Sequence, residues 1–320
     1  MKTVRSCRPS DERGIALMMV LWILVLLSII ALNHLRSTRL NTAATSAMKE
    51  EAIAYYLAVS GYHEALQYLM SDKDPVYNFH DNADNYHIDK EIPPVTGLRK
   101  KAEGEVDIRI SDEDAKININ AASPEDLRRL FTYAGLKEDA LAEVIESILD
   151  WKDPDTVHHL SGAEDEYYER LEEPYKTKNS SFDLPEELLL VKGFRPEYLY
   201  GGKDLRGVLP LITTFGNGAI NINTASKGVM DFLGLNEFEV EAVLKQRSAE
   251  AGGFRFVPPQ FASRGFSALA SNTLRVEVTG RANNSQVLSR IVAVLNRKST
   301  GAGYTIQTIY WRESVENGRG

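Results

Sequence analysis

The stretch IALMMVLWILVLLSIIAL, from Ile15 to Leu32, decides how the rest of the chain is arranged. Its 18 residues include one clearly polar side chain, that of Ser28, and no charged one. A helix of this length spans roughly 27 Å at 1.5 Å per residue, close to the thickness of the hydrocarbon core of a bilayer. The stretch therefore predicts a membrane-spanning helix close to the start of the 320-residue sequence.

The 14 residues before this helix are polar, and their basic side chains are Lys2, Arg5, Arg8 and Arg13. Basic residues beside a membrane helix favour the cytoplasmic side, so we expect a single-pass protein whose C-terminal bulk lies outside the cytoplasm. A cleaved signal peptide fits poorly. The apolar run is longer than a usual h-region, and the following NHLRSTRL offers no small-x-small cleavage site.

The helix is predicted to continue well beyond the membrane. Apolar residues recur at helical spacing from Leu35 to Leu69, and no Pro or Gly interrupts the chain from Ile15 to Ser60. We therefore expect one helix over residues 15–70, with an amphipathic second half that packs against a sheet.

Alternating side chains predict that sheet. In GEVDIRIS, residues 104–111, the apolar residues Val106, Ile108 and Ile110 share one face of a half-buried strand. The fold class is then α+β, a long helix on an antiparallel sheet. The other predicted parts are a surface loop at 71–96 within a 71–111 segment, three consecutive strands at 273–283, 285–297 and 303–314 within 266–314, and a disordered tail at 315–320.

A doubled phrase marks the segment between these strands. ININAAS covers residues 117–123, and ININTAS covers residues 220–226. Each phrase ends in a Ser suited to cap a helix, and Pro124 fits the first helical position after Ser123. We expect an all-α insertion over 112–265 built of two units. Their predicted helices are about 124–134 and 138–151, and then about 226–233 and 237–249.

The two units invite comparison with SAM-like or helix–hairpin–helix modules, which bind DNA through a glycine-rich hairpin. Here each hairpin has a single glycine, Gly135 or Gly234. Residues 112–200 contain 22 Asp or Glu against 10 Lys or Arg, a net of −12, and the whole chain is at −8. Such a surface repels phosphate. Nucleic acid is therefore not the expected partner, and a membrane-anchored DNA-uptake protein stays as an alternative.

Acidic residues crowd into the stretch ILDWKDPDTVHHLSGAEDEYYERL, 148–171. Carboxylate oxygens are the ligands that calcium prefers, although no EF-hand spacing is present. The other interpretation is that these residues fix helix ends and turns through backbone hydrogen bonds. No apolar cleft for a catalytic carboxylate pair is indicated, so we do not expect an enzyme. The candidate calcium ligands are Asp150, Asp153, Asp155, Glu164 and Asp165.

The leader, the apolar helix and its amphipathic continuation together resemble the type IV pilin and pseudopilin family. In that family a prepilin peptidase cuts after the leader's Gly, which implies cleavage between Gly14 and Ile15 and methylation of the new N-terminus. Most members carry Glu at the fifth position after the cut, where this chain has Met19. Among pseudopilins this absence is typical of the K subunit of type II secretion systems.

Further motifs are similar to the general secretion pathway protein K family, among them DWKDPD, GAEDEYY, the segment NSSFDLPEELLLVKG, and ININTA in the second copy of the doubled phrase. The resemblance implies an inner-membrane minor pseudopilin that caps a periplasmic pseudopilus and supports export across the outer membrane. It implies as partners the minor pseudopilins I, J and H, the major pseudopilin G and the peptidase, and no small-molecule substrate. Some members bind calcium in the helical domain. A calcium-stabilised periplasmic binding protein outside any pilus is a second alternative.

Overall fold

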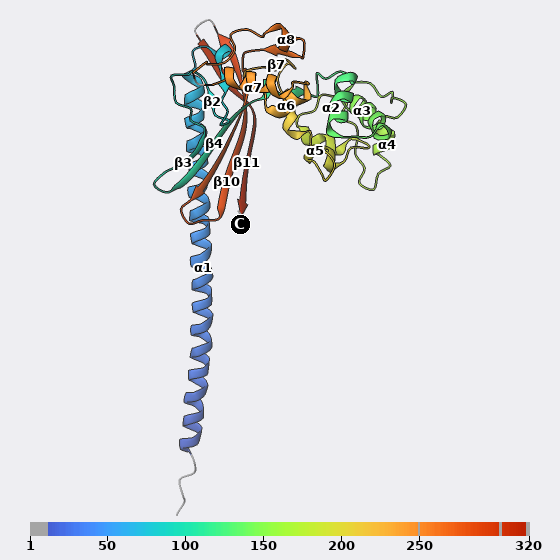
Figure 1. Cartoon of the computed structure of the whole chain (residues 1–320). Coiled ribbons are helices and arrows are strands. Elements are labelled where there is room, and N and C mark those ends of the chain that lie inside the picture. Colours follow the sequence, from blue (N-terminus) through green and yellow to red (C-terminus); the bar gives the residue numbers. More distant parts are fainter. Residues whose placement is uncertain (1–11, 249, 301–302, 318–320) are drawn as a thin grey trace, which may run out of the picture.

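The computed structural model describes residues 12–248, 250–300 and 303–317, so most of the predicted leader lies outside the described residues. Helix α1 (Glu12–Met70) is continuous, as predicted, and carries a folded head at its C-terminal end (Figure 1). It is the one described helix long and apolar enough to cross a membrane. Residues Ile15–Leu32 project away from the head as an exposed rod.

The second half of α1 packs on the sheet through small side chains. Ala54, Ala58 and Ala65 are fully buried. Gly280 of the sheet lies so close to α1 that a Cβ there would meet the backbone of Ala54 and Ala58. The helix therefore sits directly on the strands, and this contact joins the membrane segment to the head.

The sheet has five antiparallel strands in the order β11-β10-β9-β4-β3. This confirms the predicted α+β class, and β3 is an edge strand that the sequence did not predict. The strand bounds are β3 (Gly97–Lys100), β4 (Gly104–Asp112), β9 (Thr273–Ala282), β10 (Val287–Thr300) and β11 (Gly303–Asn317).

Two predictions about irregular segments were wrong. The tail does not start at residue 315, because β11 continues to Asn317, which pairs with Val287. The 71–96 segment is not simply a surface loop, because it folds under the end of α1 as a short 3-10 turn, η1 (Pro75–Tyr77), and a hairpin of β1 (Phe79–His80) and β2 (Tyr86–His87). Phe79 and Tyr86 are buried there. Strands of two residues are too short to show a period in the sequence.

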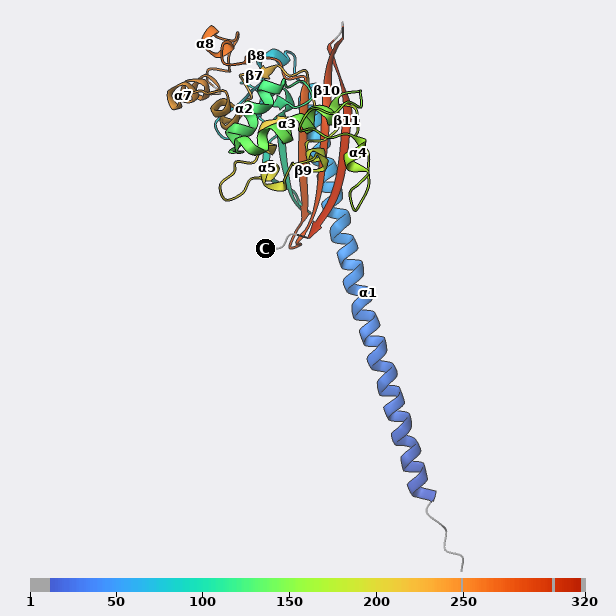
Figure 2. The same cartoon turned by 90° about the vertical axis from the view of Figure 1, so that its right-hand side faces the viewer.

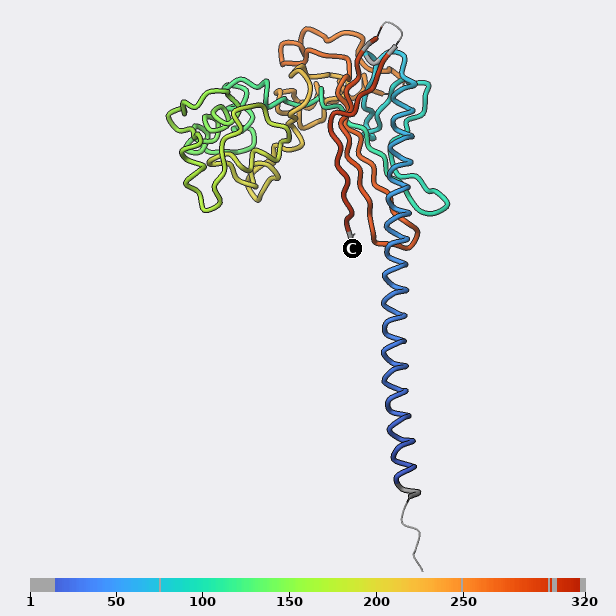
Figure 3. The backbone as a smooth tube through the Cα atoms, turned by 180° about the vertical axis from the view of Figure 1, so that it is seen from behind, coloured from blue at the N-terminus to red at the C-terminus, as the bar shows by residue number. Residues whose placement is uncertain are grey.

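The insertion leaves the sheet at Asp112 and returns at Thr273, and Asp112 pairs with Leu274 across β4 and β9. The whole insertion is thus connected to the sheet through the ends of two neighbouring strands, β4 and β9. Its own apolar core, with Leu127, Ile148 and Val229, is separate from the core between α1 and the sheet. The views in Figure 2 and Figure 3 show it beside the half of the sheet farthest from the membrane segment.

The predicted helices of the insertion are largely confirmed, but it is not all-α. Two parallel two-residue ladders, β5 with β6 and β7 with β8, close its two units, and the last of these extends the insertion beyond residue 265. The elements are η2 (Glu113–Ala115), β5 (Ile117–Asn118), α2 (Pro124–Ala134), α3 (Glu138–Lys152), α4 (Asp165–Tyr168), η3 (Pro185–Leu190), α5 (Pro196–Tyr200), η4 (Leu209–Leu211), β6 (Ile212–Thr213), β7 (Ile220–Asn221), α6 (Lys227–Phe232), α7 (Glu237–Gln246), α8 (Pro259–Ala262) and β8 (Phe266–Ala268).

Candidate functional site

The residues predicted for processing and assembly lie at the start of α1. Ile15 is 62% exposed and Met19 is 58% exposed, so both can meet a membrane or another helix. Ser28 satisfies its hydroxyl by donating to the carbonyl of Leu24 at 2.8 Å, as a polar group in lipid must. The sequence has no Asp or Glu from Ile15 to Lys49. The membrane segment therefore offers no carboxylate to a neighbouring subunit.

Each copy of the doubled phrase begins with a strand and ends at a helix N-cap. Ser123 Oγ accepts from the backbone N–H of Asp126 at 3.1 Å, and Ser226 Oγ accepts from that of Val229 at 3.3 Å. The predicted caps are confirmed. The isoleucines of both phrases are buried in the core of the insertion. In both units the phrase therefore has a structural role: it forms the first strand, contributes to the core and caps the first helix.

The asparagines of the phrase hold segments that are far away in the sequence. Asn120 exchanges two hydrogen bonds with the backbone of Phe182, of 2.8 and 2.9 Å. In the second copy Asn223 does the same with Phe254, at 2.7 and 3.0 Å. The first asparagine of each copy also binds a distant segment. Asn118 donates to the carbonyls of Phe215 and Gly216. Asn221 donates to the carbonyl of Leu269 and the hydroxyl of Ser271.

Three consecutive acids, Asp112, Glu113 and Asp114, are all buried where the insertion leaves the sheet. Asp112 Oδ2 accepts from the hydroxyls of Thr224 and Ser271, each at 2.6 Å. Burial raises the pKa of Asp112 to about 7, and the neighbouring Asp114 carboxylate adds to the rise. The carboxyl group thus joins the end of β4, the second unit and the returning chain. The sequence run DED just after a strand was a signal for this junction that we did not use.

The other two acids fasten the same junction. Burial by itself would raise the pKa of Glu113, but Lys116 and Arg275 outweigh it and hold the pKa at about 2. Glu113 Oε1 lies 2.9 Å from Lys116 Nζ and 2.6 Å from Arg275 Nε. Asp114 Oδ2 accepts the backbone N–H groups of Asn272 and Thr273, both at 2.9 Å.

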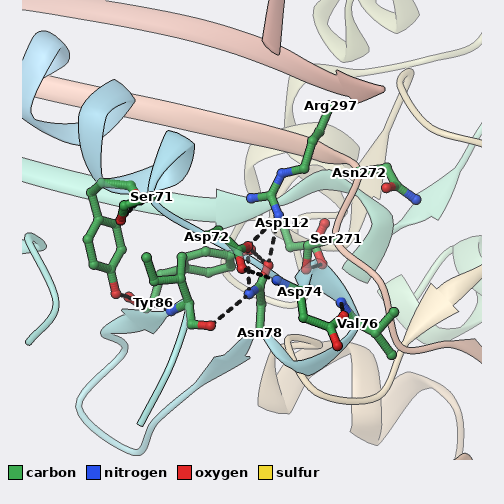
Figure 4. A network of polar contacts seen from close by, with 12 residues as sticks. Ser71, Asp72, Asp74, Val76, Asn78, Tyr86, Asp112, Ser271, Asn272 and Arg297 are labelled. Atoms are coloured by element: carbon green, nitrogen blue, oxygen red, sulfur yellow. Dashed lines mark hydrogen bonds and ion pairs between the residues drawn. The ribbon is translucent and has the colours of Figure 1, made fainter. Parts of the chain in front are cut away.

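An ion pair lies beside this junction, under the end of α1 (Figure 4). Arg297 Nη1 is 2.5 Å from Asp72 Oδ2, and each side chain is 1% exposed. Asp72 Oδ2 also accepts from Asn78 Nδ2 at 3.0 Å, and Tyr86 donates its hydroxyl to Asn78 Oδ1 at 2.8 Å. Sequence reasoning missed this network, because its members come from β10, β2 and the loop after α1.

The predicted calcium ligands do not form one cluster. Asp153, Asp155 and Glu164 bring carboxylate oxygens within 4.8 Å of one another, and Asp150 lies with Asp153 and His159 in a second group of the same size. Asp165 belongs to neither group, since its carboxylate accepts from Thr177 and faces Lys176. Histidine was not among the predicted ligands.

The carboxylates of the first group fit a cation. Glu164 is 5% exposed, and its Oε1 has no hydrogen-bond partner in the described part of the chain; the same holds for the buried Oδ1 of Asp153. Burial raises the pKa of both groups, and the neighbouring carboxylates, Asp150 and Asp155 among them, raise it further. Crowded, partly unsatisfied carboxylates of this kind are stabilised by a hard divalent cation.

The fold defines a pilin-like protein with one membrane-anchoring helix and a helical insertion between β4 and β9. A family model described as "Type II secretion system (T2SS), protein K" matches residues 106–202. Three curated relatives carry the name type II secretion system protein K. They come from Pseudomonas aeruginosa (25% identity; 88% of this chain, 84% of the relative), Aeromonas hydrophila (28%; 59% and 60%) and Pectobacterium carotovorum (27%; 74% and 76%).

Among solved structures, the chain is similar to one from the GspK-GspI-GspJ complex of the enterotoxigenic Escherichia coli type 2 secretion system. The TM-score is 0.63 at 17% identity, over 85% of this chain and 99% of that one, so the likeness shows the shared fold. Together with the family model and the relatives, it makes the chain similar to type II secretion system protein K over most of its length. These matches support a minor pseudopilin and not the DNA-uptake or binding-protein alternatives.

Proposed function

We propose that the chain occupies the tip of a periplasmic pseudopilus and works there by assembly and not by catalysis. The observation that carries this proposal is the lack of any Asp or Glu from Ile15 to Lys49. In a bilayer a carboxylate pairs strongly with a neighbour's terminal amine, because isolated charges there are so costly. A subunit with Met19 in place of that carboxylate lacks the usual contact to a preceding subunit, so it is suited to be first.

The insertion supports the same position. It hangs beside the end of the sheet farthest from the membrane (Figure 2), and the buried acids Asp112, Glu113 and Asp114 fix it there. A bulky unit held in this place would block the addition of another subunit above. The membrane helix would lie in the inner membrane with its N-terminus cytoplasmic and the head periplasmic.

The partners follow from the same role. The solved complex that this fold resembles is named for GspK, GspI and GspJ. We propose that this chain binds its own minor pseudopilins I and J through α1 and the sheet. Pseudopilin H and the major pseudopilin G would join the filament below, and prepilin peptidase would cut between Gly14 and Ile15.

Mass spectrometry of the N-terminus tests the proposal. The chain isolated from cells that contain prepilin peptidase should begin at Ile15 and be methylated. An intact Met1 in those cells would contradict the pseudopilin role. Co-purification of the full chain with tagged I and J from detergent-solubilised membranes tests the partners. Recovery of neither subunit would contradict the tip complex.

Replacing Met19 tests the tip position itself. We expect Met19→Glu to restore the missing carboxylate and allow this chain to be incorporated below other subunits. Crosslinking along isolated pseudopili would then detect it away from the tip, whereas Met18→Glu, one residue away, should not have this effect. Unchanged confinement of the Met19→Glu chain to the tip would argue that the insertion alone sets the position.

A second role concerns stability. We propose that Asp153, Asp155 and Glu164 hold a calcium ion that fixes the loop after α3 to α4, because the buried Glu164 Oε1 lacks any other partner among the described residues. Calcium should raise the melting temperature of the metal-stripped full chain, and a chelator should reverse the rise. Glu164→Gln should abolish this shift, while Glu166→Gln, whose exposed side chain pairs with Arg170, should keep it. A melting temperature that does not change with added calcium would rule the site out.

A further inference from the structure

Helix α1 has a long exposed stretch between the apolar segment and the head. Every side chain from Ile15 to Lys49 is exposed, and Ala54 is the first buried residue among the described part of α1. Figure 1 shows this part of the helix standing clear of the sheet and the insertion. The stretch from Ile15 to Lys49 also contains no Asp or Glu. Any negative partner for its basic side chains must therefore come from outside the chain.

Two arginines, Arg36 and Arg39, follow the apolar segment on one face of α1. Residues three apart are neighbours on a helix surface, and Leu32 and Ile29 precede Arg36 by four and seven residues on the same stripe. Both arginines are exposed and have no ion pair or hydrogen bond with the described residues. The stripe is thus apolar inside the membrane and doubly positive just beyond it.

The two arginines lie at the depth of the lipid headgroups. Arg36 comes four residues after Leu32 and Arg39 seven, so their backbones lie roughly 6 and 10 Å beyond the apolar segment at 1.5 Å per residue. The headgroup region adds roughly 5–8 Å to each side of the hydrocarbon core. Helical side chains tilt toward the N-terminus, which here is toward the membrane, and the long arginine stem extends this reach. Both guanidinium groups can therefore meet headgroup phosphates.

We propose that Arg36 and Arg39 bind the headgroup of an anionic phospholipid in the periplasmic leaflet, with its acyl chains along Leu32 and Ile29. A guanidinium group binds phosphate oxygens through two parallel hydrogen bonds, and an anion between two like charges relieves their repulsion. The inference rests on the membrane placement of α1 proposed above. Basic residues beside a membrane helix favour the cytoplasmic side, so two arginines on the opposite side need an anionic partner there.

Native mass spectrometry of the full chain measures which lipid it retains. The chain is purified in detergent and mixed with equal amounts of phosphatidylglycerol and phosphatidylcholine that have the same acyl chains. Both lipids contain a phosphate, but only phosphatidylglycerol has a net negative charge. Each basic residue near an anionic membrane surface gives about a fivefold preference. We therefore expect the chain to retain phosphatidylglycerol over phosphatidylcholine by at least about tenfold.

Variants of the exposed arginines test the site without disturbing the head. The double variant Arg36→Gln with Arg39→Gln should lose the preference for phosphatidylglycerol. Arg36→Lys with Arg39→Lys should keep most of it, because lysine binds phosphate as a point charge. Lys49→Gln is the matched control. It removes the same charge from the same helix, but about 26 Å beyond Leu32 and so outside the headgroup region. Its lipid preference should be unchanged.

Three outcomes would overturn the inference. The unmodified chain could retain the two lipids equally, or Lys49→Gln could reduce the preference as much as the arginine variant does. The third outcome is a double glutamine variant that keeps the lipid preference but no longer co-purifies with the I and J subunits. In that case Arg36 and Arg39 bind a carboxylate of a neighbouring subunit. None of these results would bear on cleavage between Gly14 and Ile15, which tests the pseudopilin role itself.

Discussion

Lys152 and Arg247 hold the same place in the two helical units. Each comes at the end of the unit's second helix, α3 or α7, and each donates to carbonyls in the doubled phrase that opens its own unit. Arg247 bonds the carbonyls of Ile222 and Ala225 at 3.0 and 2.7 Å. Lys152 bonds those of Ile119, Asn120 and Ala122 at 3.2 to 3.4 Å. The repeat in sequence is therefore a repeat in three-dimensional structure, with a cation at the end of the second helix, half-buried at Lys152 and buried at Arg247, that binds each loop.

Removal of either cation should destabilise its unit. Burial lowers the pKa of Lys152 and lowers that of Arg247 to about 9, which shows how far both are withdrawn from water. Lys152→Met and Arg247→Met would each leave carbonyls of the doubled phrase without their donor, at a cost of about 1–3 kcal/mol in the free energy of unfolding. Chemical unfolding of the full chain measures this. The exposed Lys245→Met, two residues before Arg247, should change it by less than about 0.5 kcal/mol.

The junction carboxyl predicts a dependence on pH. The pKa of Asp112 is about 7 in the folded chain and near 3.9 in an unfolded one. Because the folded value is higher, the contribution of Asp112 to stability is full below about pH 4 and is lost as pH rises through 7, by up to about 1.4 kcal/mol per unit.

Asp112→Asn cannot titrate, so it isolates this effect. The unfolding free energy of the unmodified chain minus that of the variant should fall between about pH 4 and 7 and be flat above. Urea unfolding at several pH values measures it. Asp204→Asn, which changes an exposed aspartate in the same way, is the matched control, and a difference for Asp112→Asn that stays constant with pH would refute the prediction.

The buried ion pair beside the junction should show strong coupling. Asp72→Asn or Arg297→Met leaves one buried charge without its partner, at about 3–5 kcal/mol each. Two nitrogen atoms of Arg297, Nε and Nη2, already lack hydrogen-bond partners among the described residues. Without Asp72 the buried guanidinium charge would therefore be even less well compensated. The double variant should cost clearly less than the sum of the two. If the losses in unfolding free energy of the two single variants simply add up in the double variant, Asp72 and Arg297 do not stabilise the fold by interacting with each other.

At Gly280 the contact between α1 and the sheet should be too close to accept a side chain. A Cβ at Gly280 would meet the backbone of Ala54 and Ala58, and backbone cannot move aside without lifting the helix from the strands. We expect Gly280→Ala to cost about 1–3 kcal/mol and lower the melting temperature. Gly202→Ala is the control, because its Cβ would make ordinary contacts of 3.5 Å with Glu197. Equal melting temperatures for the two variants would contradict this packing.

Local patterns in the sequence predicted much of the fold. The apolar run and its helical continuation gave α1, and the capping residues gave α2 over the residues expected, Pro124–Ala134. Both signals act between neighbours in the chain, where spacing fixes which side chains meet. The hairpin of β1 and β2 escaped notice because its pairing involves two residues on each strand.

In the candidate metal site, too, some residues could be predicted from local sequence and others could not. Glu164 and Asp153 were named as candidate calcium ligands because acidic residues gather within a short stretch. The structure groups their carboxylates with that of Asp155, whereas the Asp165 carboxylate accepts from Thr177 instead. His159 was not among the predicted ligands, although it lies in the same segment and groups with Asp150 and Asp153. Only the loop's path brings its ring to Asp150, since that path depends on Gly162 and on contacts with α3.

The sequence by itself determined a helix long and apolar enough to cross a membrane, its continuation onto a sheet, and a doubled helical insertion, because hydrophobic length, periodicity and caps are local properties. Only the tertiary structure decided what the doubled phrase does and how the insertion is held. Asn120 meets Phe182, Asp112 meets Ser271 and Asp72 meets Arg297 across long stretches of chain. Such partners are chosen by the packing of the sheet, α1 and the insertion, because a buried polar group bonds whichever group the fold brings to it.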